Sequence, residues 1–134
     1  MKLTIQQEEQ IRELTSYLNR ALPFIRNLSS EFHSGAERKS WNQFSIMIEG
    51  IEWVIFTLSF LVSSPVAYVQ KADHRMMLAQ LQDHVQAIAE AVENKDHVLI
   101  GDLIAYEFVP LLEEMHLGLT ELKIVEVGSD DANE

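Results

Sequence analysis

The sequence predicts an all-α protein, an antiparallel helical bundle of four main helices. Four stretches of the chain carry apolar residues at the three- and four-residue spacing of an amphipathic helix. The connections between these stretches are short, and short connections make consecutive helices run antiparallel. The chain has 134 residues, of which 47% are hydrophobic, so it is large and apolar enough for one domain with its own core.

The first predicted helix covers residues 4–33. Its apolar positions form a single stripe from Ile11 to Phe32. Pro23 lies within this stretch, and a proline inside a helix removes one backbone hydrogen bond and bends the axis. Because the stripe keeps its phase on both sides of the proline, we predict one helix kinked at Pro23 rather than two separate helices.

The second predicted helix contains the most apolar run of the chain. Gly35 is expected to end the first helix, and two possible capping boxes, 34–37 and 40–43, leave the start of the second one open. Its core stripe consists of Trp41, Phe44, Ile48, Ile51, Ile55, Leu58 and Val62. The apolar run 53–62 is shorter than the ~20 residues that a membrane span needs, so we expect a buried helix and no contact with a membrane.

The third and fourth helices are predicted to form an antiparallel hairpin. A stripe from Leu78 to Val92 defines the third helix, whose opposite side is polar. The sequence leaves open whether residues 65–72 are helical. Asn94 is expected to take the left-handed conformation that ends a helix, and Asp96 to cap the next one. The fourth helix then has a core stripe from Ile100 to Leu119.

The second and fourth helices each carry a second apolar line, whereas the first and third have one. A helix that is apolar on two sides is buried on two sides. We therefore expect the extra lines to meet another chain, with internal cover as the alternative. The candidate interface residues are the bulky members of these lines: Trp53, Phe56, Phe60, Leu99, Leu103 and Tyr106.

The composition narrows the range of partners. The net charge of −11 repels phosphate backbones, and no basic stripe offsets it, so we expect no nucleic-acid partner. The chain has no cysteine, which excludes disulfides and thiolate metal sites and is compatible with the cytoplasm. We expect residues 1–127 to form a single domain and residues 128–134 to be a disordered acidic tail.

Metal binding is the sharpest chemical hypothesis that the sequence offers. Two-metal bundles use a Glu-x-x-His pair on each of two helices and a single Glu on each of two others. The weak candidates here are Glu49, Glu52, Glu113 and His116, and the second Glu-x-x-His pair is missing. We therefore expect solvated helix edges, no cofactor and no catalytic residue. Nucleophilic catalysis has no support either, since no Gly-x-Ser-x-Gly or glycine-rich phosphate loop occurs.

Two segments carry a family resemblance. Residues 48–53, IEGIEW, and residues 93–114, ENKDHVLIGDLIAYEFVPLLEE, resemble short all-helical proteins of uncharacterised function from Bacillus- and Clostridium-type bacteria. His97 stands where that family tends to have Tyr, and Met115 where it tends to have Trp. The resemblance implies no activity, cofactor or catalytic residue. It implies that Asp102, Tyr106, Glu107 and Pro110 form one local unit, with Pro110 at a kink.

These observations favour a non-enzymatic bundle that acts through protein contacts. We expect an adaptor or regulator that pairs with itself, as a homodimer, through helices two and four. One alternative is a small acidic chaperone of the secretion or flagellar-export type, which would bind an amphipathic client helix. The other is a metal-dependent enzyme that uses the four candidate ligands named above.

Overall fold

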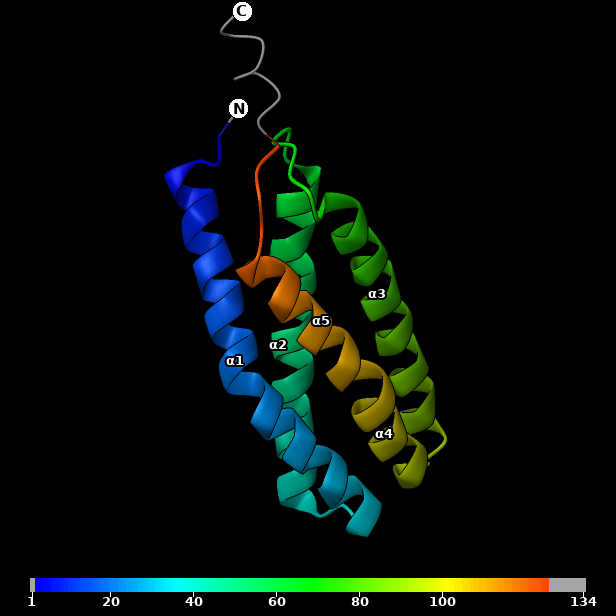
Figure 1. Ribbon diagram of the computed structural model, residues 1–134. Coiled ribbons are helices and arrows are strands. Elements are labelled where there is room, and N and C mark those ends of the chain that lie inside the picture. The colour runs from blue at the N-terminus through cyan, green and yellow to red at the C-terminus, as the bar shows by residue number, and fades with distance from the viewer. Residues whose placement is uncertain (1, 126–134) are drawn as a thin grey trace, which may run out of the picture.

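Four helical rods follow one another along the chain and run alternately up and down (Figure 1). The computed structural model describes residues 2–125, and the acidic tail predicted for residues 128–134 lies outside that range. The all-α bundle is confirmed. The rods are α1 (Ile5–Ser34), α2 (Arg38–Ser63), α3 (Lys71–Glu93) and a fourth that joins α4 (His97–Leu103), η1 (Ile104–Phe108) and α5 (Val109–Thr120).

Each rod packs against its two neighbours in a square arrangement. α1 contacts α2 and the fourth rod, and α3 contacts the same two from the other side. Within residues 2–125, no Cα atom of α2 lies within 8 Å of one in α4, η1 or α5. The fourth rod lies in front in Figure 1 and α2 behind it, so these two rods are diagonal partners across the core.

The first helix is continuous through its proline, as predicted. Thr4 caps α1 through a reciprocal pair with Gln7, in which each backbone N–H donates to the side chain of the other residue. The exposed Pro23 faces away from the core, and the ribbon of α1 bends near its middle (Figure 1). The bend lets the stripe from Leu14 to Phe32 stay buried along its whole length.

Two of the predicted turns differ in detail. Neither predicted capping box starts α2, because Glu37 is its N-cap and donates its backbone N–H to the hydroxyl of Ser40 at 3.1 Å. Asp96 caps α4 as predicted, accepting from the backbone N–H of Leu99 at 3.0 Å. The prediction that Asn94 is left-handed was wrong, since the positive φ of 56° belongs to Lys95.

The segment between α2 and α3 is irregular rather than helical. Residues 64–70 form a connection with a bend at its start and a turn at its end, and α3 begins at Lys71. Tyr68 forms an isolated antiparallel bridge with Ile124, which holds the chain after α5 against this connection. The backbone N–H of Val69 donates to the carbonyl of Lys123 at 2.8 Å. This pairing closes one end of the bundle.

The fourth rod contains a π-helical turn just before Pro110. The N–H of Val109 donates to the carbonyl of Ile104, five residues back rather than four. Pro110 has no N–H, and in a regular α-helix its ring would clash with the carbonyl of Tyr106. The wider turn accommodates the proline and keeps buried side chains on both sides of it facing the core, including Ile104, Phe108 and Leu112.

Candidate functional site

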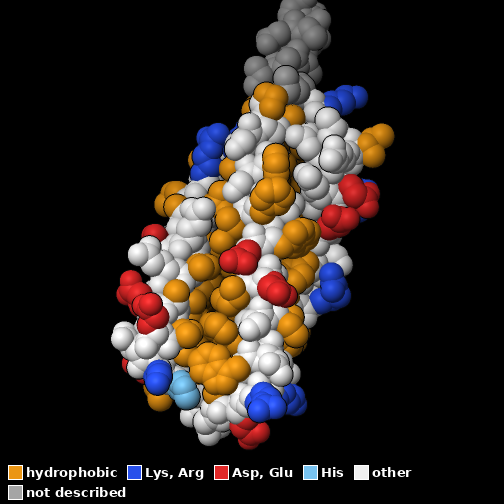
Figure 2. Space-filling model, turned by 180° about the vertical axis from the view of Figure 1, so that it is seen from behind, with side chains coloured by type: hydrophobic (Ala, Val, Ile, Leu, Met, Phe, Trp, Pro, Cys, Tyr) orange, Lys and Arg blue, Asp and Glu red, His pale blue; other side chains and the backbone are white. Residues whose placement is uncertain are grey.

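The outward face of α2 carries a row of large apolar side chains. Ile46, Phe56 and Phe60 are 59%, 63% and 57% exposed, and Trp53 is half-buried between them. Figure 2 shows hydrophobic side chains along this side of the molecule, interrupted midway by acidic ones. Burying an aromatic side chain contributes roughly 1.5–3 kcal/mol, so this exposed row makes the outward face of α2 the candidate interaction surface.

The aromatic pair at the upper end of this face stands between two hollows. The rings of Phe56 and Phe60 pack edge to face, with their centroids 4.9 Å apart. On one side a hollow of about 620 Å³ separates the pair from α1 and is lined by Gln7 and Gln10. On the other side a hollow of about 430 Å³ is lined by Ile55 and other residues of α2. The pair therefore projects as a ridge.

A groove of about 750 Å³ continues the face toward Ile46, between α1 and α2. Tyr17 crosses its floor and packs edge to face on Trp53, with the ring centroids 5.5 Å apart. A Cβ atom on Gly50 would lie 1.8 Å from the Tyr17 hydroxyl oxygen, so the missing side chain is what lets the tyrosine lie there. Partial burial raises the pKa of Tyr17, and the nearby Arg20 opposes the shift.

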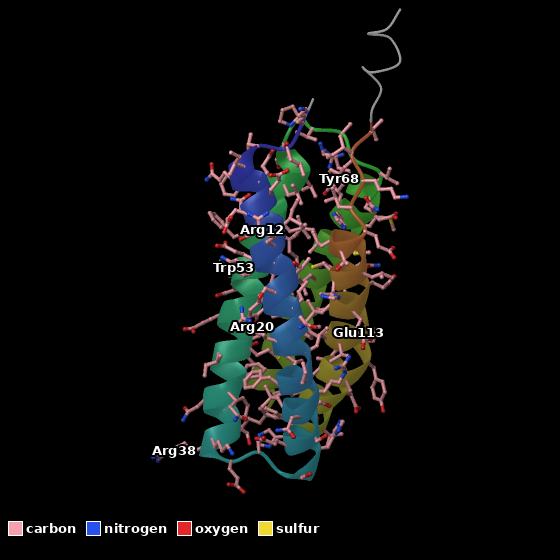
Figure 3. All side chains as sticks on the ribbon, turned by 60° about the vertical axis from the view of Figure 1, so that its left-hand side comes forward. Arg12, Arg20, Arg38, Trp53, Tyr68 and Glu113 are labelled. Carbon is pink, nitrogen blue, oxygen red and sulfur yellow. The ribbon has the colours of Figure 1, made fainter. Side chains whose placement is uncertain are left out.

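Charged side chains of both signs border the groove. Arg12 and Arg20 of α1 line it together with Glu13 and Glu49. In Figure 3, Trp53 lies at a level between the two arginines, which belong to the neighbouring helix. The contribution of α1 was not predicted, because Arg12, Tyr17 and Arg20 lie outside its core stripe. Gly50 was the available signal, as a mid-helix glycine marks a close approach by a neighbour.

The second apolar line of the fourth rod lies on the other side of the bundle. Tyr106 is 70% exposed and Leu99 is 40% exposed, while Leu103 is half-buried. Because α2 and the fourth rod are diagonal, the structure brings Trp53, Phe56 and Phe60 together but does not bring them to Leu99, Leu103 and Tyr106. The six candidate interface residues therefore form two surfaces.

The four weak metal candidates do not converge. Glu49 lines the groove beside α1, and Glu52 borders the hollow next to Ile55. Glu113 lies across the bundle, where it accepts a hydrogen bond from Arg26 of α1. His116 is half-buried one turn further along α5. In the part of the chain that the structure describes, no three His, Asp or Glu side chains are placed to hold a metal ion.

Two histidines pair with acids from other helices. Nε2 of His33 lies 2.8 Å from Oδ1 of Asp102, and its ring covers Gly101. Nε2 of His84 lies 3.7 Å from Oε1 of Glu107, beside the π turn. Both pairs fasten the fourth rod to its neighbours at partly exposed positions, where an ion pair contributes little to stability.

One buried polar pair was not predicted. His74 of α3 has no exposed surface, and its Nδ1 lies 2.9 Å from the Tyr68 hydroxyl. Its Nε2 has no hydrogen-bond partner among the described residues and faces Gly118, where a Cβ atom would be 2.9 Å away. Burial lowers the pKa of His74 and raises that of Tyr68, so both groups stay neutral near pH 7.

By length and composition, α2 could cross a membrane. Its most apolar 18-residue window has a mean hydropathy of 1.7, and 39% of that window is buried. A core helix of a bundle meets the same two criteria, so this result alone does not favour a span.

Fold and site together define an all-α four-helix bundle with an exposed, largely aromatic helix face. The sequence matches the model of a domain of unknown function, DUF8042, over residues 9–118. The chain therefore belongs to that family, and the matched residues extend from α1 to α5. Neither a curated protein nor a solved structure matches the chain.

Proposed function

We propose that the protein is a non-enzymatic interaction bundle, a cytoplasmic adaptor or regulator that pairs with a second copy of itself through the outward face of α2. We also propose that the protein is bacterial, as its resemblance to proteins of Bacillus- and Clostridium-type bacteria implies. The exposed row formed by Ile46, Trp53, Phe56 and Phe60 carries the proposal. Aromatic anchors dominate the energy of protein interfaces, and a monomer seldom exposes such a row without a partner.

Charge favours a second copy over an acidic or basic partner. The whole chain carries −11, which opposes association between copies. Around the α2 face, however, the charges are nearly balanced: the four cations Arg12, Arg20, Arg38 and Lys39 accompany the five anions Glu9, Glu13, Glu37, Glu49 and Glu52. A face with nearly balanced charge can meet its own copy without net repulsion, and its arginines and glutamates can pair across the contact.

The proposal assigns self-pairing to α2 alone. The sequence suggested one interface built by the second and fourth helices together, but these rods are diagonal in the bundle. The exposed line of Leu99, Tyr106 and Leu117 would remain free in a dimer formed through α2. An adaptor could use this second line for a client helix.

Light scattering after gel filtration, over a wide concentration range, tests self-pairing. We expect the unmodified chain to have the mass of a dimer. The double variant Phe56→Ala/Phe60→Ala should dissociate at least about 100-fold more easily, because interface aromatics each contribute about 2 kcal/mol or more. Its helical circular dichroism should be unchanged, since both rings are exposed in the single chain.

The matched control is Leu103→Ala/Tyr106→Ala, which removes a similar apolar line from the opposite side. We expect this variant to keep the dimer mass. A monomer at every concentration of the unmodified chain would show that self-pairing is wrong. A dimer that survives the phenylalanine changes but is lost in the control would move the interface to the fourth rod.

A further inference from the structure

Positions on the outward face of α2 are spaced symmetrically about Trp53, although the two halves carry different residues. Ile46 and Phe60 each lie seven residues from Trp53, which is the repeat that keeps side chains in line on paired helices. Gly50 and Phe56 each lie three residues from it, on opposite sides. The half toward Ile46 therefore holds the groove with glycine at its floor, and the half toward Phe60 holds the aromatic ridge.

A ridge and a groove on one helix face fit together only when the second copy is reversed. In an antiparallel pair centred on Trp53, position 56 lies opposite position 50, and position 60 lies opposite position 46. The Phe56 and Phe60 rings of each copy would then enter the 750 Å³ groove of the other. In a parallel pair, ridge would meet ridge and both grooves would stay open.

The charges favour the same direction. Glu49 lies on the Ile46 side of Trp53, whereas Arg12 lies on the Phe56 side, because α1 runs antiparallel to α2 (Figure 3). Reversal about Trp53 brings Glu49 of the partner subunit to the Arg12 side twice per dimer. There it would share the Arg12 guanidinium with Glu9, which pairs with Arg12 within the single chain. A parallel pair would instead set Glu49 against Glu49 of the partner subunit, and like charges that face each other across an interface are destabilising.

We propose that two copies pair through α2 in antiparallel orientation, about a two-fold axis that passes close to Trp53. This inference rests on the proposed self-association and goes further by fixing which residues meet. Each interface half is made of the aromatic ridge of one copy and the α1–α2 groove of the other. Tyr17, on the groove floor, becomes an interface residue although it belongs to α1.

Cysteine crosslinking can distinguish the two directions because the natural chain contains no cysteine. Asn42 and Ser63 lie near the two ends of the face, and both are exposed. They are 21 residues apart, which is about 32 Å along a helix at 1.5 Å per residue. In the antiparallel pair, Asn42 lies opposite the stretch that holds Ser63 of the partner subunit, and each residue lies roughly 30 Å from its own copy.

The experiment compares three variants, Asn42→Cys, Ser63→Cys and the double variant, each treated with a short bismaleimide. Light scattering first establishes that each variant keeps the mass of the unmodified chain, so that a failure to associate is seen separately. We expect the double variant to give a covalent dimer on a denaturing gel and neither single variant to do so. Covalent dimers from both single variants would mean parallel pairing and would overturn the inference while self-association stands. A dimer mass without any crosslinking would overturn it as well, because the ends of α2 would then not meet.

Discussion

The inner and outer faces of α2 both carry large apolar side chains, but the inner face is buried in the bundle and the outer face is exposed. On the inner face Ile51 and Leu58 have no exposed surface, whereas on the outer face Phe56 and Phe60 leave more than half of theirs exposed. Both faces repeat at helical spacing, so periodicity shows that α2 has two apolar sides without showing what covers each. The difference between them separates the part of α2 that folds the monomer from the part that remains for a partner.

The largest expected effect is a loss of monomer stability from the inner face. Ile51→Ala should lower the free energy of unfolding by about 2–5 kcal/mol, because it leaves a cavity in a packed core. Phe56→Ala, five residues further along, should change it by less than about 1 kcal/mol, since an exposed ring loses few contacts. Urea unfolding of both variants, at protein concentrations low enough that the dimer is dissociated, measures this contrast. Equal losses would mean that Phe56 is covered within the chain.

The next effect concerns the charges beside the outer face. Arg12→Glu alone and Glu49→Arg alone should each weaken self-association roughly tenfold, since each replaces attraction by repulsion at two symmetric places worth up to ~1 kcal/mol apiece. Mixed together, the two variants should form a heterodimer in preference to either homodimer, because both cross-pairs become attractive again.

Native mass spectrometry of the mixture can count the three species when the variants differ in an affinity tag. If the two substitutions acted only within their own chains, the mixed dimer would not be favoured over the two homodimers. A statistical distribution would therefore remove the Arg12–Glu49 contact from the interface. Arg26→Glu is the matched control, because Arg26 pairs with Glu113 on the far side of α1, and it should not favour mixing.

The helices themselves were predictable because their signals are local. The stripes in α1 and α3, the cap at Asp96 and the kink at Pro23 all follow from residues within one or two turns. On α2 the predicted core stripe included Ile51 and Leu58. It did not include Met47, Val54 and Leu61, which are also buried, because a helix with two apolar sides does not show where its inner face is centred.

The candidate site depends on contacts between helices, which the sequence does not encode locally. That Tyr17 covers Gly50 depends on the register of α1 against α2. The separation of the two apolar lines could have been foreseen, since the second and fourth helices of an up-and-down bundle with neighbouring connections are diagonal. His74 was missed because an isolated histidine in a helix pattern gives no sign of burial.

The smallest expected effect is the pH dependence of stability that comes from the one buried histidine, His74, among the residues that the structure describes. His74 interrupts the apolar interior near the closed end of the bundle, and burial holds its pKa below the ordinary value of 6.5 while the neighbouring Asp73 opposes that shift. As the pH falls through about 6.5, His74 therefore takes up a proton more readily in the unfolded chain than in the folded protein. The free energy of unfolding consequently falls on acidification. We expect the free energy of unfolding to fall more steeply between pH 7.5 and pH 5.5, roughly one unit on either side of that ordinary value, in the natural chain than in His74→Gln.

Tyr68→Phe is the control, because it removes the hydroxyl next to Nδ1 and leaves the buried imidazole in place. This variant should be less stable than the natural chain at every pH and should keep the steep acid slope. Identical slopes for the natural chain and His74→Gln would mean that His74 takes up its proton as readily in the folded protein as in the unfolded chain. The end of the bundle closed by the Tyr68–Ile124 bridge would then open to water more readily than the rest of the core.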